Sequence, residues 1–232
     1  MTLARYRSIV VLTGAGISHS AGLPTYRGPG GLWNNPELEK LTDVSALGSR
    51  REDVCTMFWQ FHRSILRVEP TIAHRALAAF EATLPATTRF LIITQNIDGL
   101  HQRAGSQRVC EYHGTLMRWR CEACGSELQP ADGELLPLHC GKLMRPAIVL
   151  FGEMIPPEAG QAAKRALRDC DLFVAIGTSG TVYPASGFVR WAESNGARRV
   201  LLNLEISHDA RDEFTECQAG TADELVPRLF VQ

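Results

Sequence analysis

Four continuous apolar runs are the first regular pattern along the chain. They lie at residues 9–12, 90–93, 172–176 and 200–202, without polar alternation. Such runs are typical of strands buried on both faces, as in a parallel sheet covered by helices. Stretches with helical periodicity, such as 73–84 and 158–170, separate them. The alternation predicts an α/β fold, a Rossmann-like doubly wound parallel sheet.

Two segments interrupt this alternation. Residues 29–74 are richer in polar and aromatic side chains and have a helical pattern, and residues 115–145 contain a cluster of cysteines. We expect both to be insertions that together form a smaller domain, a helical module (29–74) and a zinc-ribbon module (115–145). The Rossmann-like sheet domain would then comprise residues 1–28, 75–114 and 146–232.

Each predicted strand ends in glycine, hydroxyl, amide or acid residues. In open α/β sheets ligands bind at the carboxyl ends of the strands, so these side chains are expected to surround one crevice. Loops after strands are often polar, but four such loops together favour a ligand site. The residues concerned are Gly14, Gly16, Ser18, Gln95, Asn96, Asp98, Gly177, Thr178, Ser179, Asn203 and Glu205.

The loop after the first run has the sequence TGAGISHSAG. Gly14 and Gly16 would let the backbone approach a phosphate, whose charge the start of a following helix would favour. The dinucleotide fingerprint of hydride-transferring enzymes requires a third glycine where His19 stands, so that class fits poorly. Gly-Ala-Gly alone could equally serve a tight turn.

The overall composition excludes some classes of partner. The 232 residues have a formal net charge of −1, so neither nucleic acid nor an acidic membrane surface is expected as a partner. No apolar run approaches the ~20 residues of a membrane-spanning helix. The apolar run near the amino terminus leads into TGAGIS rather than into a cleavage site, which favours the first strand of a cytoplasmic protein.

Three of the seven cysteines, Cys121, Cys124 and Cys140, lie close together in the sequence. A Cys-x-x-Cys knuckle followed by a later ligand pair is typical of a structural zinc ribbon in a reducing compartment. The second half is irregular, because Pro137 stands where another cysteine is expected. His139 or the more distant Asp132 could supply the fourth ligand. A degenerate ribbon without metal is the alternative, and we favour zinc.

His113 follows the QNID segment and immediately precedes the cysteine-containing insertion. A single histidine is more often structural than catalytic. Its place between the two predicted lobes nevertheless favours a general base, because neutral imidazole accepts protons near pH 7.

Taken in order, the motifs GAGIS, TYRG with GLW, TQNIDGLH, HG, CEAC, RP-IVLFGE, GTSGTVYPA and NLE resemble those of the sirtuins, NAD-dependent protein lysine deacylases. The resemblance extends from about residue 8 to residue 228. It implies removal of an acyl group from lysine with release of nicotinamide and O-acyl-ADP-ribose. His113 would be the general base, with Asn96 and Asp98 in the nicotinamide pocket.

The resemblance also implies positions for both substrates. NAD would be bound by Gly14, Ala15, Gly16, Ser18, Tyr26, Arg27, Gln95, Ile97, Gly177, Thr178, Ser179, Asn203 and Glu205. The acylated-lysine peptide would add as a strand between two segments, one with Val149, Phe151 and Gly152 and the other with Val182 and Tyr183.

The chain departs from sirtuins that prefer acidic acyl groups. Their Tyr-x-x-Arg pair is replaced by Trp59 and His62, and histidine does not replace a bidentate arginine without loss. We therefore expect acetyl or other neutral acyl groups to be removed faster than succinyl groups, although Trp59 could simply pack in the helical module.

The sequence leaves two alternative functions open, an NAD glycohydrolase or ADP-ribosyltransferase and a non-catalytic NAD-sensing module. A monomer or weak oligomer is expected.

Overall fold

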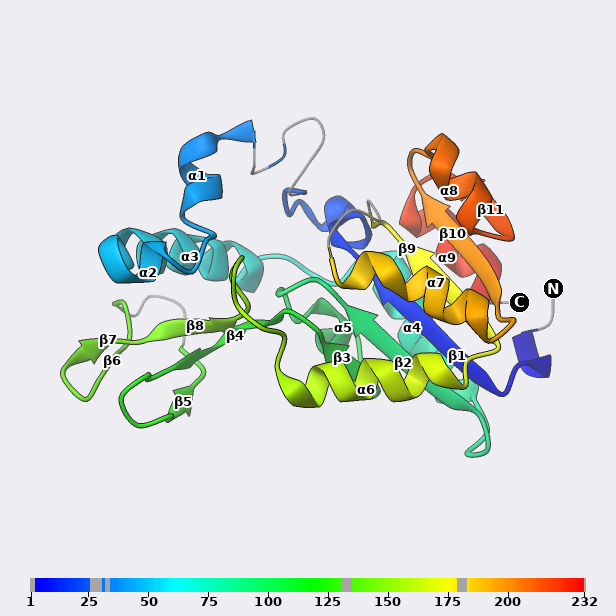
Figure 1. The fold of residues 1–232 in the computed structure, drawn as a ribbon, viewed down its shortest axis with the longest axis horizontal. Helices are drawn as coiled ribbons and strands as arrows, with labels where there is room; N and C mark the ends of the chain where they lie inside the picture. Colours follow the sequence, from blue (N-terminus) through cyan, green and yellow to red (C-terminus); the bar gives the residue numbers. More distant parts are fainter. Residues whose placement is uncertain (1–2, 26–30, 32–33, 131–134, 179–182, 232) are drawn as a thin grey trace.

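The computed structural model describes residues 3–25, 31, 34–130, 135–178 and 183–231. Within these ranges no helix combines the length and the apolar content needed to cross a membrane. Two groups of elements lie side by side along the long axis of the molecule, one built on a large parallel sheet and one on shorter strands and helices (Figure 1).

The large sheet has six strands in the order β11-β10-β9-β1-β2-β3, and all neighbouring pairs are parallel. The strand order reverses direction between β1 and β9, which is where doubly wound sheets bind ligands. The strands are β1 (Ser8–Thr13), β2 (Arg89–Thr94), β3 (Val109–Glu111), β9 (Leu172–Ile176), β10 (Arg198–Asn203) and β11 (Glu216–Ala219).

Helices cover both faces of this sheet, which explains its continuous apolar strands. In β1, Ile9 and Val11 pack on one face with α4 (Ile72–Thr83) and α9 (Ala222–Phe230). Val10 and Leu12 pack on the other with α6 (Pro157–Arg168) and α7 (Phe188–Ser194). Successive residues of β1 between Ile9 and Leu12 therefore bury opposite faces, which explains why this run is apolar without polar alternation.

The second group of elements, which we call the smaller lobe, consists of α1–α3 and β4–β8. An antiparallel sheet has the order β5-β4-β8, and β6 and β7 form a separate hairpin. Its own core includes the fully buried Trp119 and the nearly buried Trp59. The elements are α1 (Pro36–Lys40), α2 (Ala46–Ser49), α3 (Arg51–Leu66), β4 (Gly114–Arg120), β5 (Glu127–Leu128), β6 (Leu138–His139), β7 (Lys142–Leu143) and β8 (Arg145–Ile148).

The predicted fold class is confirmed. The four apolar runs form β1, β2, β9 and β10, and the two helical patterns form α4 and α6. The edge strands β3 and β11 were not predicted, because both are short and only partly buried. Two short helices, α5 (Leu100–Arg103) and α8 (His208–Glu213), complete the α-helices of the described residues.

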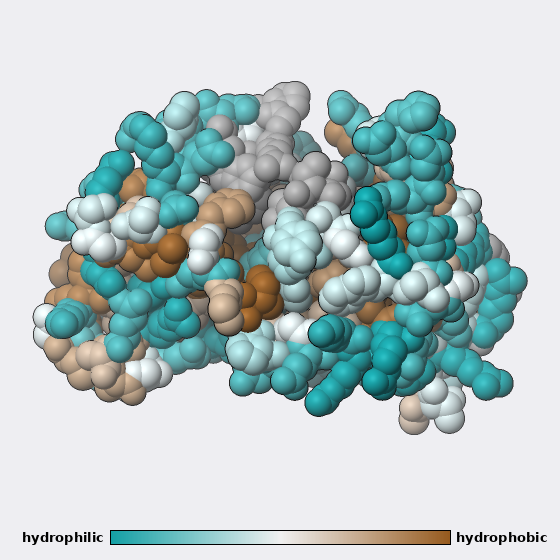
Figure 2. Space-filling view, in the orientation of Figure 1, coloured by the Kyte–Doolittle hydropathy of each residue, from teal (hydrophilic) through white to brown (hydrophobic). Residues whose placement is uncertain are grey.

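The visible surface differs between the two groups of elements. Apolar residues gather over the smaller lobe, whereas the surface over α6 and α8 is mainly hydrophilic (Figure 2).

Candidate functional site

A cavity of about 910 Å³ lies at the carboxyl ends of β1, β2, β9 and β10 and extends to the smaller lobe. Its position at the reversal of strand order is the one that the fold predicts for a ligand. Most of the predicted site residues line it, namely Gly14, Ala15, Gly16, Gln95, Asn96, Ile97, His113, Val149, Phe151, Gly152, Gly177, Thr178, Tyr183, Asn203 and Glu205.

Glycines pack the loop after β1 directly against the loop after β9. The Gly16 amide donates to the Gly177 carbonyl at 2.9 Å. A Cβ on Gly177 would lie 2.6 Å from the amide nitrogen of Ile17, and Gly177 has φ of +59°. The glycines therefore permit close packing of two backbones as well as the approach of a ligand to the cavity that they line.

We expected a helix to begin after Gly16, and the structure shows that this prediction is wrong. Residues Ala15–Ile17 and His19–Ala21 form two three-residue 3₁₀ helices, so no long helix dipole points at the cavity from this loop. A phosphate held here would lie against the loop backbone rather than at the start of a long helix, and the Gly14 and Gly16 amides already donate to the Ile176 and Gly177 carbonyls.

A buried chain of hydrogen bonds lies behind the cavity wall. The Asn96 side-chain amide donates to the Gly14 carbonyl at 3.0 Å and to Ser18 Oγ at 3.2 Å. Ser18 Oγ in turn donates to Asp98 Oδ2 at 2.7 Å. Ser18 and Asp98 are 2 % and 5 % exposed and do not line the cavity, so they support its wall through Asn96.

Asp98 is held in an environment that disfavours its charge. Burial raises the pKa of its carboxyl, although hydrogen bonds from the Leu100 amide at 3.0 Å and from Ser18 oppose the shift. A carboxyl group of this kind binds hydrogen-bond donors in a site from which water is excluded. Both Asp98 oxygens already accept protein hydrogen bonds, so in this structure Asp98 acts on the cavity through Ser18 and Asn96.

Side-chain amides connect the ends of β2, β9 and β10. Gln95 Nε2 donates to Thr178 Oγ1 at 2.9 Å, and Asn203 Nδ2 donates to the Thr178 carbonyl at 3.3 Å. All three residues line the cavity. The polar strand ends thus fix one another before any ligand binds.

His113 lies between the sheet and the smaller lobe, immediately before β4. Its Nδ1 is 3.1 Å from the Gln95 carbonyl oxygen. A carbonyl only accepts, so Nδ1 bears the proton and Nε2 of the neutral ring has the free lone pair. Burial lowers the pKa of His113, and the Gln95 hydrogen bond opposes the shift. The ring is therefore a neutral base at the wall of the cavity.

The segment from Ile148 to Gly152 forms the opposite wall. The Val149 amide donates to the His113 carbonyl at 2.9 Å, and Phe151 exchanges backbone hydrogen bonds with Thr42 and Val44, each at 2.9 Å. This arrangement requires Gly114, whose missing Cβ would lie 2.2 Å from the Ala147 carbonyl oxygen. Backbone contacts thus connect this wall both to the base and to the connection between α1 and α2 of the smaller lobe.

Trp59 and His62 do not reach the cavity. His62 is fully buried, its ring nitrogens lie 3.1 Å from the Leu116 carbonyl and 3.2 Å from the Pro130 carbonyl, and its ring stacks on Trp59. From this helix the cavity lining has Phe58 instead. The structure therefore corrects the expected acyl-facing position of both residues, because the helical face that bears them packs into the core.

Four predicted site residues, Tyr26, Arg27, Ser179 and Val182, lie outside the described residues, as does the alternative metal ligand Asp132.

Several lining residues were not found from the sequence. Thr42 and Phe58 come from the smaller lobe, where no sequence motif marks them. The Gly220–Asp223 stretch follows β11, which lacks a continuous apolar run. If β11 had been recognised as a strand, the polar residues that follow it would have indicated this part of the cavity lining.

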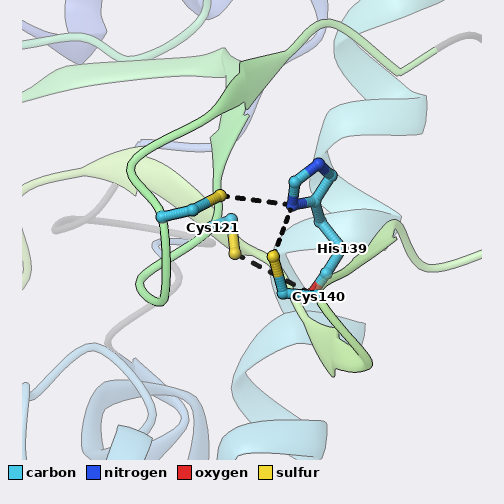
Figure 3. Close-up of side chains that lie close together, drawn as sticks. Cys121, His139 and Cys140 are labelled. Atoms are coloured by element: carbon cyan, nitrogen blue, oxygen red, sulfur yellow. Dashed lines mark hydrogen bonds between the residues drawn. The ribbon is translucent and has the colours of Figure 1, made fainter.

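The cysteine cluster converges around His139 (Figure 3). Ligand atoms of Cys121, Cys124, His139 and Cys140 all lie within 4.8 Å of one another. His139 Nδ1 is 3.3 Å from both Cys124 Sγ and Cys140 Sγ. Zinc–sulfur bonds of about 2.3 Å place tetrahedral ligands a little under about 4 Å apart, so this donor set fits a structural zinc ion.

A tight turn explains how adjacent residues face one ion. His139 pairs with Lys142, so Cys140 and Gly141 form a two-residue hairpin loop, with φ of +50° and +71°. Positive φ at both positions is typical of a type I′ turn. The turn directs the Cys140 thiol back toward His139, which makes His139 the fourth member of the cluster among the described residues.

Known families and proteins resemble this chain over most of its length. The model of the Sir2 family matches residues 14–184. NAD-dependent protein deacylase 2 of Pyrobaculum aerophilum is 43% identical over 98% of this chain and 91% of its own length.

Solved structures of Sir2 proteins have the same fold. A Sir2 homolog in complex with NAD superimposes with a TM-score of 0.87 at 33% identity, over 99% of this chain and 90% of that one. A Sir2 variant with a deacetylated p53 peptide and 3′-O-acetyl ADP ribose gives 0.85 at 32% identity, over 97% and 93%.

Proposed function

Because the chain belongs to the Sir2 family, we infer that it is an NAD-dependent protein deacylase that removes acyl groups from lysine side chains. The observation that supports this most directly is the neutral His113 on the wall of one cavity that also contains the glycine loops and the Ile148–Gly152 segment. NAD and an acylated peptide or protein are its substrates.

The sheet side of the cavity would hold NAD. The backbone of the Gly14–Gly16 loop would lie against the phosphates, and Asn203 and Glu205 would contact the adenosine end. Asn96 and Ile97 would surround nicotinamide, with Asp98 behind them. Bound NAD supplies a ribose carbon that accepts the acyl oxygen as nicotinamide leaves.

His113 would remove a proton at Nε2. The Gln95 carbonyl fixes Nδ1–H, so the free lone pair belongs to the other nitrogen. A pKa lowered by burial keeps the ring neutral at pH 7, which a general base requires. We propose that the proton comes from a ribose hydroxyl, and that apolar wall residues such as Ile97, Ile148 and Leu150 exclude water.

We further propose a preference for neutral acyl groups. The described part of the cavity lining contains no lysine or arginine, so the distal carboxylate of a succinyl group would meet no described cation there. Phe58, which is 6 % exposed, presents an apolar ring instead. An unpaired buried carboxylate is costly, whereas a short neutral chain is not.

The four-residue cluster fits one structural zinc ion, which Cys121, Cys124, His139 and Cys140 would hold. Thiolate ligands require a reducing environment, which supports the proposed cytoplasmic location. A monomer or weak oligomer, without nucleic-acid or membrane partners, stays a prediction that sedimentation would test.

Nicotinamide release with and without acyl peptide tests the proposal. We expect release to depend on the peptide and acetyl peptides to be processed at least about tenfold faster than succinyl peptides. Release that ignores the peptide would instead indicate a glycohydrolase. Equal rates on both peptides would remove the proposed acyl preference while leaving deacylation intact.

A further inference from the structure

A largely buried ion pair lies at the Ile148–Glu153 wall of the cavity, and its carboxylate partner, Glu153, is one of the residues that line the cavity. Arg145 is 1 % exposed, and its guanidinium forms a bidentate pair with Glu153 at 2.6 and 2.8 Å. An arginine this deeply buried is rarely found without a paired carboxylate.

The Arg145–Glu153 pair fixes the backbone of the wall through hydrogen bonds. Arg145 Nη2 also donates to the Ile148 carbonyl at 3.0 Å, and the Leu150 amide donates to Glu153 Oε2 at 2.8 Å. The Glu153 amide returns a bond to the Leu150 carbonyl at 3.0 Å. The Arg145 hydrogen bond therefore fixes Ile148 at the start of the segment, and the two hydrogen bonds between Glu153 and Leu150 fix its end.

Two further groups extend this network to the metal knuckle. Glu122 lies between Cys121 and Cys124, and its Oε1 is 3.8 Å from Arg145 Nη1. Its other oxygen pairs with Arg51 of α3 at 2.5 Å. Burial would raise the pKa of Glu153, but hydrogen bonds and charge, chiefly from Arg145, lower it. The carboxylate therefore stays ionised and the pair persists at neutral pH.

We propose that the Arg145–Glu153 pair, supported by Glu122, is a positioning device that aligns the Ile148–Gly152 backbone for the acylated peptide. The proposal rests on the deacylase function stated above. Arg145 does not line the cavity, and Glu153 lines it from the Ile148–Glu153 wall rather than from the glycine loops on the sheet side, where NAD would be held. Disrupting the pair should therefore raise the KM for peptide without raising the KM for NAD.

Glu153→Gln tests this directly, because it removes the charge and keeps the shape. We expect the peptide KM to rise at least about tenfold and the NAD KM to change less than about twofold. Glu193→Gln is the matched control, since Glu193 is 54% exposed and pairs with Arg199 at 3.0 Å on the sheet side, outside the cavity lining. The control should leave both constants unchanged.

Amide hydrogen exchange gives a readout that needs no activity. Amides of residues 148–152 should exchange faster in Glu153→Gln, whereas those of β1 should not. Equal rises in both KM values, or unchanged exchange in the segment, would overturn the proposal. A wild-type protein inactive on every acyl peptide would instead refute the proposed function, and the exchange result would still stand.

Glu122→Gln applies if Glu153→Gln cannot be purified. Glu122 is 43% exposed, so its replacement does not bury an unpaired charge. We expect the peptide KM alone to rise about two- to threefold, with the metal retained. An unchanged peptide KM, or a change that accompanies metal loss, would overturn the proposal.

Discussion

The two sides of the cavity are built by different means. On the sheet side, parallel strands bring Gly14, Gln95 and Gly177 together, and backbone contacts between glycines fix the loops. On the side of the smaller lobe, short strands are held by an ion-pair network and a cluster of metal ligands. The cofactor side therefore follows from strand topology, whereas the peptide side depends on a few specific side chains.

This difference implies that the two sides can be damaged separately. A change in the smaller lobe should affect peptide binding and leave NAD binding largely intact, whereas a change between β1 and β9 should affect NAD first. The predictions below test that separation.

Metal removal is expected to have the largest effect. Structural zinc contributes about 10 kcal/mol to the folding of small metal domains, so the β5–β7 region should unfold locally. Cys124→Ser should reduce metal content and thermal stability, whereas Cys217→Ser, outside the cluster, should change neither. Metal analysis and thermal unfolding measure both. Purified protein without metal and with unaltered stability would contradict the assignment.

Gly177→Ala should destabilise the sheet side next. Its Cβ would lie 2.6 Å from the Ile17 nitrogen, and its φ is +59°, so strain and steric overlap add. We expect the free energy of unfolding to fall by about 3 kcal/mol, with weaker NAD binding.

Gly196→Ala is the matched control for that change. Gly196 has φ of +72°, but a Cβ at this position would meet no atom within 4 Å, so only the backbone penalty of about 1 kcal/mol applies. Urea unfolding measures the free energy of unfolding of both variants. Equal losses would show that the close packing of the loops after β1 and β9 does not determine the effect of Gly177→Ala.

Two buried histidines should make the sheet side sensitive to acid. His74 and His101 pack edge to face at 4.6 Å, and burial lowers the pKa of His74 to about 4, although Asp223 opposes the shift. Burial and His74 lower the pKa of His101. Unfolding lets both rings bind protons, so their stabilising contribution is complete above pH 6.5 and is lost toward pH 4.

The loss attributable to His74 should be about 2 kcal/mol between pH 7.5 and pH 5. Urea unfolding at both values measures it, with His74→Gln as the comparison. Between pH 7.5 and pH 5, the free energy of unfolding of this variant should fall by about 2 kcal/mol less than that of the wild type. A pH dependence equal to that of the wild type would show that His74 does not contribute.

The sequence predicted the sheet side far better than the smaller lobe. Continuous apolar runs marked β1, β2, β9 and β10, and their polar ends marked Gln95 and Thr178. Contacts such as those of Arg145 with Glu153 and Glu122 join segments whose pairing depends on how the smaller lobe folds. The hydrophobic periodicity of the sequence does not specify which charged side chains of the smaller lobe form ion pairs.

Errors in the smaller lobe have the same physical cause. The resemblance to sirtuins placed Trp59 and His62 at the acyl group, yet the face of α3 that bears them packs on Trp119 and the Leu116 carbonyl. Which face of a helix is buried depends on its neighbours as well as on its own pattern. His139, by contrast, was named from the sequence as a candidate fourth ligand, and the turn at Cys140 explains how it faces the same cluster as its neighbour.

His113 joins the two sides, because its ring is bound to Gln95 and its carbonyl to Val149. The most direct test of the account is to measure NAD binding and deacylation in His113→Ala. We predict an NAD dissociation constant within about threefold of the wild-type value and deacylation slower by at least about 100-fold. Deacylation at the wild-type rate would contradict the role of His113 as the general base.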